Sequence, residues 1–123
     1  MTEVKYLTKE EIIRIHNEII ENFGGTEGLL NEGLLEIVME QMKVSKDIIQ
    51  KSITLLFGII KNHPFIDGNK RTALESFYTF LNYNSIHFKI EDINKAEDII
   101  LKIAKDEISK NLVRKWIEDI TSD

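Results

Sequence analysis

The residues best suited to chemistry lie in one short stretch, HPFIDGNKRTA, which begins at His63. Histidine has an unperturbed pKa close to neutrality, so an imidazole here could accept the proton of an attacking hydroxyl. The carboxylate of Asp67 could bind a divalent cation, and Lys70 and Arg71 could bind an anion through charge-assisted hydrogen bonds. Gly68 would let that anion come close to the main chain. These residue types in one loop predict a site that handles a nucleotide phosphate.

Two apolar helical patterns flank this stretch. Apolar residues recur at helical spacing before it, between Ile48 and Ile60, and again after it, between Ala73 and Leu81. Pro64 should end the first helix, because a proline disfavours the α conformation in the residue before it. Gly68 or Asn69 marks the start of the second helix. The sequence thus predicts a helix, a tight loop and a second helix, with the histidine at the break, where its side chain can face a cleft.

The start of the second helix is a suitable place for an anion. Its first backbone N–H groups have no partners within the helix, and the helix dipole adds partial positive charge there. Asp67 would repel a phosphate unless a divalent cation lay between them, and Mg²⁺ typically binds one or two carboxylates together with phosphate oxygens. We therefore predict Asp67 as a Mg²⁺ ligand, with the nucleotide and water supplying most of the coordination.

Each of these residues also has an ordinary structural interpretation. The triplet Asp67-Gly68-Asn69 is a common turn and N-cap sequence, and the Lys-Arg pair could be a solvated helix face. A single histidine is more often a helix-end residue than a base, and Phe65 is typical of a core anchor for the loop. The combination favours a functional site, because a structural turn needs no base, carboxylate, glycine and cation pair together.

The stretch HPFIDGNKRTA closely resembles the signature of the Fic/Doc family, and in particular of its Doc (death-on-curing) branch. Most Fic proteins have a glycine where this chain has Lys70, and a second arginine where it has Leu74. Fic proteins of that commoner type transfer AMP from ATP to a hydroxyl. The Doc branch, with lysine, is known as a kinase-like toxin that phosphorylates a threonine of elongation factor Tu. Both departures therefore favour the Doc branch.

The resemblance extends over roughly the whole chain by order of elements. The stretch IHNEIIENFGG that begins at Ile15, and GLLE that begins at Gly33, are similar to the amino-terminal part of Doc proteins. Doc relatives often have an Arg-Asp pair before that second stretch and a proline after it, where this chain has Leu30-Asn31 and Gln41-Met42-Lys43. These departures concern target docking rather than the phosphate site.

The resemblance implies a role for each residue of the loop. His63 would be the base that deprotonates the target hydroxyl, Asp67 would hold Mg²⁺, and Phe65 would be the buried hinge. The phosphate loop would be lined by Gly68 and Asn69, with the phosphates of the nucleotide held by Lys70 and Arg71. The implied function is that of an ATP-dependent toxin that phosphorylates a Ser/Thr hydroxyl of a target such as elongation factor Tu. The implied partner is an antitoxin that lays a helix into an apolar groove and blocks the cleft.

Two other functions stay open at this point. AMP transfer would use the same residues with the α-phosphoryl group, rather than the γ-phosphoryl group, facing the base. A non-catalytic helical interaction module would keep the motif only for nucleotide sensing or as a structural relic. The chemistry of the loop residues alone does not decide which phosphoryl group moves; the preference for phosphoryl transfer comes from the resemblance, through Lys70 and Leu74.

Length and composition limit the remaining choices. The chain has 123 residues, which predicts one domain spanning residues 1–123 with a core that needs no disulfides. The net charge is −5, and acidic and basic residues are interspersed, which argues against binding nucleic acid through its phosphates. The chain has no cysteine, no signal-like amino terminus and no apolar stretch that could cross a membrane. We expect a soluble cytoplasmic protein.

The whole pattern predicts an all-α fold, a compact bundle of about six helices with the active loop between two central ones. Thr8 and Glu11 form a capping box for the first helix, which Gly24-Gly25 should close. His16 lies on the apolar stripe of that helix, as a core-edge histidine with a hydrogen-bond partner. The residues from Gly28 to Gly33 are expected to form a loop; the resemblance implies a flap that aligns an incoming target segment, and a plain surface loop is the alternative. Helix starts are expected at Ser45, Asn94 and Ser109, and the strand-like fragment at 86–90 is too short for a sheet.

Overall fold

The computed structural model describes residues 3–88 and 90–121, except for the side chains of residues 90–94. Within this part of the chain the backbone forms helices and no β-sheet; a single β-bridge pairs Leu29 with Phe65. The predicted all-α fold is therefore confirmed. The helices are α1 (Lys9–Phe23), α2 (Glu32–Val44), α3 (Ile48–Asn62), α4 (Asn69–Tyr83), α5 (Ile90–Ala104) and α6 (Lys110–Thr121).

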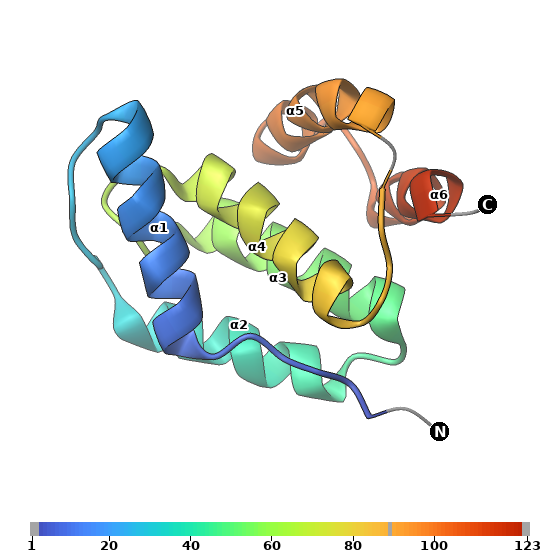
Figure 1. Cartoon of the computed structure of the whole chain (residues 1–123), viewed down its shortest axis with the longest axis horizontal. Coiled ribbons are helices and arrows are strands. Elements are labelled where there is room, and N and C mark those ends of the chain that lie inside the picture. Colours follow the sequence, from blue (N-terminus) through green and yellow to red (C-terminus); the bar gives the residue numbers. More distant parts are fainter. Residues whose placement is uncertain (1–2, 89, 122–123) are drawn as a thin grey trace.

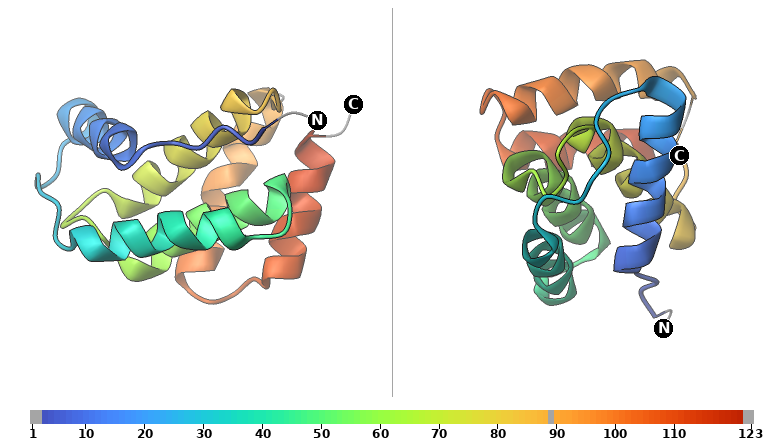
Figure 2. Two further views of the ribbon diagram at one scale, coloured as in Figure 1. Left: turned by 90° about the horizontal axis from the view of Figure 1, so that it is seen from below. Right: turned by 90° about the vertical axis from the view of Figure 1, so that its left-hand side faces the viewer.

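Helices α3 and α4 form the centre of the molecule (Figure 1). They pack along each other, α3 also packs against α2 and α6, and α4 also packs against α1. Helix α5 contacts both central helices. The loop between α3 and α4 lies on the same side of the molecule as the connection between α1 and α2, as Figure 2 shows from two further directions. The predicted position of the HPFIDGNKRTA loop, between two central helices, is confirmed.

The core lies between these layers. Helix α3 is apolar on most of its circumference, because α2, α4 and α6 cover it on different sides. Each large apolar side chain that is fully buried contributes about 1.5–3 kcal/mol to folding. The largest side chains with almost no exposure are those of Phe65, Phe77 and Phe80. Since Phe65 belongs to the α3–α4 loop, the core itself fixes that loop.

Helix α3 begins later than Ser45, so the predicted start is wrong. The N-cap is Asp47, whose Oδ1 accepts a hydrogen bond from the backbone N–H of Gln50 at 2.8 Å. Ser45 instead ends α2, and its hydroxyl donates to the carbonyl of Gln41 at 2.8 Å. The buried ammonium of Lys51 donates to the carbonyls of Met42 and Ser45, at 2.9 and 2.8 Å, and thereby caps the end of α2. Helix α2 therefore reaches Val44 and leaves Ser45 unable to start the next helix.

Other predicted helix ends agree with the structure. Thr8 and Glu11 form the expected capping box, and the N–H of Gly24 donates to the carbonyl of Ile20 at the end of α1. Ser109 Oγ accepts a hydrogen bond from the N–H of Leu112 at the start of α6. Helix α5 begins at Ile90, earlier than the predicted start at Asn94. The Asn94 side chain lies outside the described residues.

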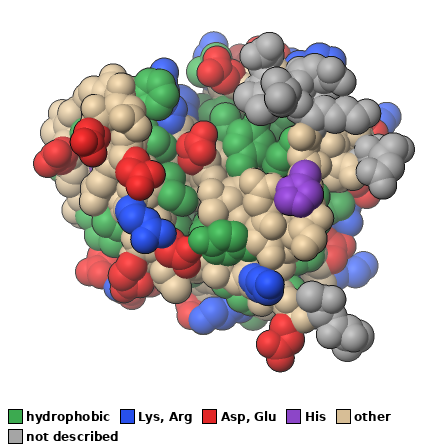
Figure 3. All heavy atoms as spheres, in the orientation of Figure 1, with side chains coloured by type: hydrophobic (Ala, Val, Ile, Leu, Met, Phe, Trp, Pro, Cys, Tyr) green, Lys and Arg blue, Asp and Glu red, His purple; other side chains and the backbone are tan. Residues whose placement is uncertain are grey.

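The visible surface is mixed in charge. On the face shown in Figure 3, acidic and basic side chains lie among one another, with apolar side chains between them. None of the helices in the described ranges is long and apolar enough to span a bilayer. Exposed large apolar side chains include Phe23 at the end of α1 and Ile66 in the α3–α4 loop. Both lie beside the predicted site.

Candidate functional site

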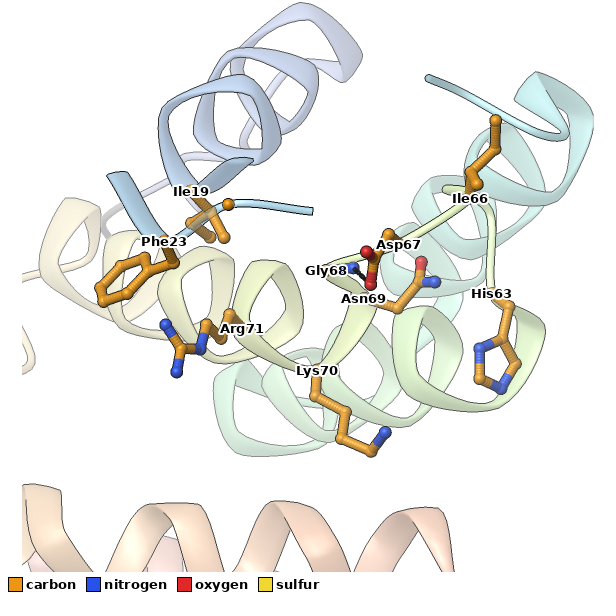
Figure 4. A pocket seen from close by; sticks show the side chains of 10 residues that line it. Ile19, Phe23, His63, Ile66, Asp67, Gly68, Asn69, Lys70 and Arg71 are labelled. Atoms are coloured by element: carbon orange, nitrogen blue, oxygen red, sulfur yellow. Dashed lines mark hydrogen bonds between the residues drawn. The ribbon is translucent and has the colours of Figure 1, made fainter. Parts of the chain in front are cut away.

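The predicted site residues line one cavity of about 360 Å³. Its walls are the α3–α4 loop, the first turn of α4, and Ile19 and Phe23 at the end of α1 (Figure 4). The structure brings together all of the residues predicted from the sequence: His63, Asp67, Gly68, Asn69, Lys70 and Arg71. A potential base, a carboxylate, two cations and the start of a helix therefore line the same cavity.

His63 occupies the position directly after α3. It is the C-cap of that helix, with φ 49° and ψ 60°, in the left-handed region that few residues other than glycine adopt. Proline at position 64 disfavours the right-handed α conformation of the residue before it. As a result the helix stops at Asn62 and the exposed imidazole points away from the core toward the cavity. Nothing in the described part of the chain hydrogen-bonds this imidazole.

The start of α4 lacks a side-chain cap. Gly68, the N-cap, has φ 74° and contributes no side-chain hydrogen bond. The next N–H with a main-chain partner is that of Thr72, which donates to the carbonyl of Gly68 at 2.9 Å. The backbone N–H groups of the first turn thus have no internal acceptor, and they lie at the positive end of the helix dipole. This end of α4 can bind an anion.

The side chain of Asn69 stabilises the loop, and only its backbone N–H is left for a ligand. Although Asn69 borders the cavity, only 7% of the residue is exposed. Its Oδ1 accepts from the N–H of Phe65 at 3.0 Å, and its Nδ2 donates to the carbonyl of the same residue at 2.8 Å. Both ends of the amide are therefore used to close the loop, which leaves the backbone N–H of Asn69 as the group available to a phosphate.

Asp67 is exposed to the cavity but tightly held. Its Oδ1 accepts from the N–H of Gly68 at 2.8 Å, and its Oδ2 accepts from the N–H of Thr26 at 3.1 Å. The hydrogen bonds from Thr26 and then from Gly68 lower the pKa of Asp67, because they stabilise the ionised carboxylate. The backbone carbonyl of Asp67 meets the Nε2 of His16 at 2.7 Å. An ionised carboxylate in a fixed direction is suited to bind a cation.

This carboxylate fits Mg²⁺ that arrives with a nucleotide. Among the residues the structure describes, no three ligating side chains gather to form a metal cage. Mg²⁺ needs none, because it usually binds one or two carboxylates and takes its other ligands from phosphate oxygens and water. The oxygens of Asp67 each accept one hydrogen bond and have a further lone pair for a metal. The donor set therefore agrees with the predicted role of Asp67.

The two cations of the first turn take separate directions (Figure 4). The guanidinium of Arg71 lies over the ring of Phe23, 4.0 Å from its centroid. The side chain of Lys70 leaves α4 on another side of the cavity. Within the described ranges neither makes an ion pair, so both charges are available to an anionic ligand.

The connection between α1 and α2 crosses the α3–α4 loop. The N–H of Ile66 donates to the carbonyl of Gly28 at 3.0 Å, and the N–H of Leu30 donates to the carbonyl of Pro64 at 2.8 Å. The segment predicted as a flap is thus attached by backbone hydrogen bonds to the loop that carries His63 and Asp67. Sequence reasoning missed the contacts of Asp67 with Thr26 and His16. The position of His16 on the apolar stripe of α1 indicated a hydrogen-bond partner for this side chain, but not which residue it would be.

Comparison with known proteins finds similarity over most of the chain. A profile described as the Fic/DOC family matches residues 6–81, which include the whole cavity. The chain is 29% identical over 116 residues to protein kinase doc of Escherichia phage P1, covering 89% of this chain and 90% of that protein. It is 30% identical over 112 residues to toxin Doc of Mycolicibacterium smegmatis, covering 85% of this chain and 82% of that protein.

Proposed function

Because the chain belongs to the Fic/Doc family, we propose that it is a Doc-like toxin of a toxin-antitoxin system that uses ATP to phosphorylate a protein. The observation that carries this proposal is the cavity in which His63, Asp67 and the uncapped start of α4 meet. The acceptor would be a Ser/Thr hydroxyl of a target such as elongation factor Tu, and the result would be an arrest of translation. The names of the two relatives, a protein kinase and a toxin, support this function.

The residues of the cavity suggest how the reaction proceeds. The backbone N–H groups of α4, with Lys70 and Arg71, would hold the phosphates of ATP and offset their charge. His63 would take the proton of the target hydroxyl while that oxygen forms its bond to the γ-phosphorus. The bond between the γ-phosphorus and the β–γ bridging oxygen breaks, and ADP leaves with the bonding electrons. Mg²⁺ at Asp67 would neutralise charge on the phosphate oxygens.

Two residues favour phosphoryl transfer over AMP transfer. The adenylylating Fic proteins have glycine and arginine where this chain has Lys70 and Leu74. In the structure, Leu74 lies with Ile100 and Leu101 in an apolar groove between α4 and α5, next to the cations. The position of that second arginine is therefore part of an apolar surface in this chain, which supports the Doc-type reaction.

The same proposal includes a partner and a location. The resemblance to Doc toxins implies an antitoxin as partner. We infer that an antitoxin helix covers the exposed apolar side chains near the site, of which Phe23 and Ile66 are 66% and 52% exposed. The target and the ATP pool would place the active protein in the cytoplasm.

One experiment separates the functions. The purified protein is incubated with ATP, Mg²⁺ and translation factors, and the intact mass of each factor is measured. A gain of one phosphate supports the proposal, and a gain of AMP would show adenylylation instead. If no factor changes mass while expression still stops growth, the protein is better described as a binding module. The His63→Ala variant serves as the inactive control.

A further inference from the structure

We propose that His16 of α1 is a positioning residue for the site, because its imidazole holds the peptide group that directs the Asp67 carboxylate. This inference rests on the proposed function for its catalytic consequence, although its structural part can be tested without nucleotide. His16 lies outside the HPFIDGNKRTA stretch and 51 residues from Asp67 along the chain. The sequence predicted a core-edge histidine with a hydrogen-bond partner, and the structure identifies that partner as the backbone carbonyl of Asp67.

The hydrogen bond of His16 has a defined direction. Its Nε2 lies 2.7 Å from the backbone carbonyl oxygen of Asp67. A carbonyl oxygen can only accept, so Nε2 must carry the hydrogen, and this fixes the tautomer of a neutral ring. The residue is 1% exposed, which removes water as a competing donor for that carbonyl. The contact is therefore a buried and oriented hydrogen bond.

The ring of His16 is itself held in place. It stacks on the ring of Phe65, with centroids 4.0 Å apart and planes inclined by 7°. Phe65 is 1% exposed, and both its backbone groups are bound by the side chain of Asn69. The imidazole thus has little freedom to turn away from Asp67. Because the core holds the ring of His16, the hydrogen bond of this ring restrains the loop.

The peptide group between Asp67 and Gly68 explains how this affects the carboxylate. A trans peptide is planar, so its C=O and N–H point in opposite directions. When His16 binds the carbonyl on the core side, the N–H of Gly68 must point the other way, where it donates to Asp67 Oδ1 at 2.8 Å. Gly68 has φ 74°, a conformation in which glycine opposes rotation only weakly. The His16 hydrogen bond therefore supplies the restraint that the glycine lacks.

The second carboxylate oxygen of Asp67 is held by a third segment of the chain. Asp67 Oδ2 accepts from the N–H of Thr26 in the α1–α2 connection. The carboxylate is consequently directed from the core through His16, from the start of α4 through Gly68, and from the α1–α2 connection through Thr26. Removal of the first contact should loosen the other two. A purely packing role for His16 would predict no such effect, because stacking on Phe65 needs only an aromatic ring.

Two variants separate the hydrogen bond from the packing. His16→Phe keeps an aromatic ring on Phe65 but has no donor, whereas His16→Gln keeps an N–H donor near the Nε2 position but has no ring. Amide hydrogen exchange of Thr26 and Gly68 is measured in both variants without ligand. The binding of Mg²⁺ with a non-hydrolysable ATP analogue is then measured, together with kcat and KM for the protein target.

We expect faster exchange of both amides in His16→Phe and near-normal exchange in His16→Gln. Loss of a residue that orients a metal ligand typically costs about 10–100-fold in metal affinity or activity, and we expect a loss of that size in kcat for His16→Phe. Unchanged exchange in His16→Phe would refute the proposal, as would equal damage in both variants. If the wild type transfers no phosphoryl group, the proposed function fails while the exchange data still decide the role of His16.

A second pair covers the case in which His16→Phe does not fold. His16→Asn has the same amide chemistry as His16→Gln but a side chain too short to reach the Asp67 carbonyl. Loss of amide protection at Thr26 in the Asn variant alone would support the positioning role. Equal protection in the Asn and Gln variants would overturn it.

Discussion

At the scale of single residues, His63 and Asp67 combine opposite properties in one cavity. The imidazole of His63 is exposed and has no hydrogen-bond partner in the described part of the chain, so it can meet a substrate hydroxyl. The carboxylate of Asp67 is held by two backbone N–H groups, so it presents a fixed direction to a cation. A base has to receive a proton and a metal ligand has to stay in place, and the two environments suit these tasks.

His63→Ala tests the base. Loss of a general base usually lowers a rate about 10²–10⁴-fold, so phosphoryl transfer and growth arrest should disappear. Because the side chain is exposed at a helix end, the free energy of unfolding and the binding of ATP should change little. His87→Ala is the matched control, since His87 is also exposed but does not line the cavity. Full toxicity of His63→Ala would exclude this residue as the base.

Gly25→Ala tests the contact of Asp67 with the α1–α2 connection. A Cβ atom at Gly25 would lie 2.7 Å from Asp67 Oδ2, so the carboxylate would have to move. Gly24→Ala is the control, since both glycines have positive φ, but a Cβ at Gly24 would meet nothing within 4 Å. Both variants should lose about 1–3 kcal/mol of stability through backbone strain. Only Gly25→Ala should also lose affinity for Mg²⁺ with nucleotide, measured by calorimetry; equal losses would contradict the predicted contact.

The contacts of Asp67 also show what single residues reveal before a structure is known. All six predicted residues line one cavity because they are neighbours in a loop whose two flanking helices are evident from periodicity. His16 and Thr26 could not be assigned, because they reach Asp67 from segments 51 and 41 residues away. Asn69 borders the cavity as predicted, but its side chain binds Phe65, and only the geometry of the closed loop shows this.

At the scale of helices, the sequence pattern predicts that a helix forms better than it predicts the residues at which the helix begins and ends. The apolar stripes of α1, α3, α4 and α6 follow from hydrophobic periodicity alone. The residue at which α3 starts does not follow from periodicity, because Ser45 and Asp47 are both good N-cap residues. The choice depends on where α2 ends and on Arg114, a residue of α6 that pairs with Asp47 at 2.9 Å. Tertiary contacts of this kind are invisible to local spacing.

Asp47 should make the stability of the helix junction sensitive to acid. The hydrogen bond from Arg114, and then that from the N–H of Gln50, lower the pKa of Asp47. The folded pKa thus lies below the unfolded one, so the stabilising contribution is complete above the unfolded value and is lost as the pH falls through the folded value. Asp47→Asn should be less stable than wild type at about pH 7, and the difference should shrink at about pH 3.

Urea unfolding at the two pH values measures this difference. Arg114→Gln should reproduce most of the effect, because it removes the partner that contributes most to the shift. Asp47 and Arg114 are partly exposed, so screening by water keeps the contribution of the pair modest. A difference between wild type and Asp47→Asn that stays constant with pH would show that the ion pair does not form in solution.

At the scale of the whole molecule, the site depends on three separate segments. Helix α1 supplies His16, the α1–α2 connection supplies Thr26, and the α3–α4 loop supplies His63 and Asp67. The core that packs α1 against α4 therefore also holds the cavity together. The net charge of the molecule is −5, so the adjacent cations Lys70 and Arg71 make this cavity locally more favourable for anions than the average charge predicts.

A ligand that binds across these segments should stabilise the entire fold. A ligand present at a hundred times its dissociation constant adds about 2.7 kcal/mol to the stability of the folded state. ATP with Mg²⁺ should therefore raise the unfolding temperature of the wild type. The double variant Lys70→Ala, Arg71→Ala should lose this increase, because it removes both cations that we propose bind the phosphates. The control Lys105→Ala, Lys115→Ala removes the same charge from exposed positions outside the cavity and should keep the increase. If both double variants respond to ATP alike, net charge rather than this cavity determines binding, and the nucleotide must lie elsewhere on the molecule.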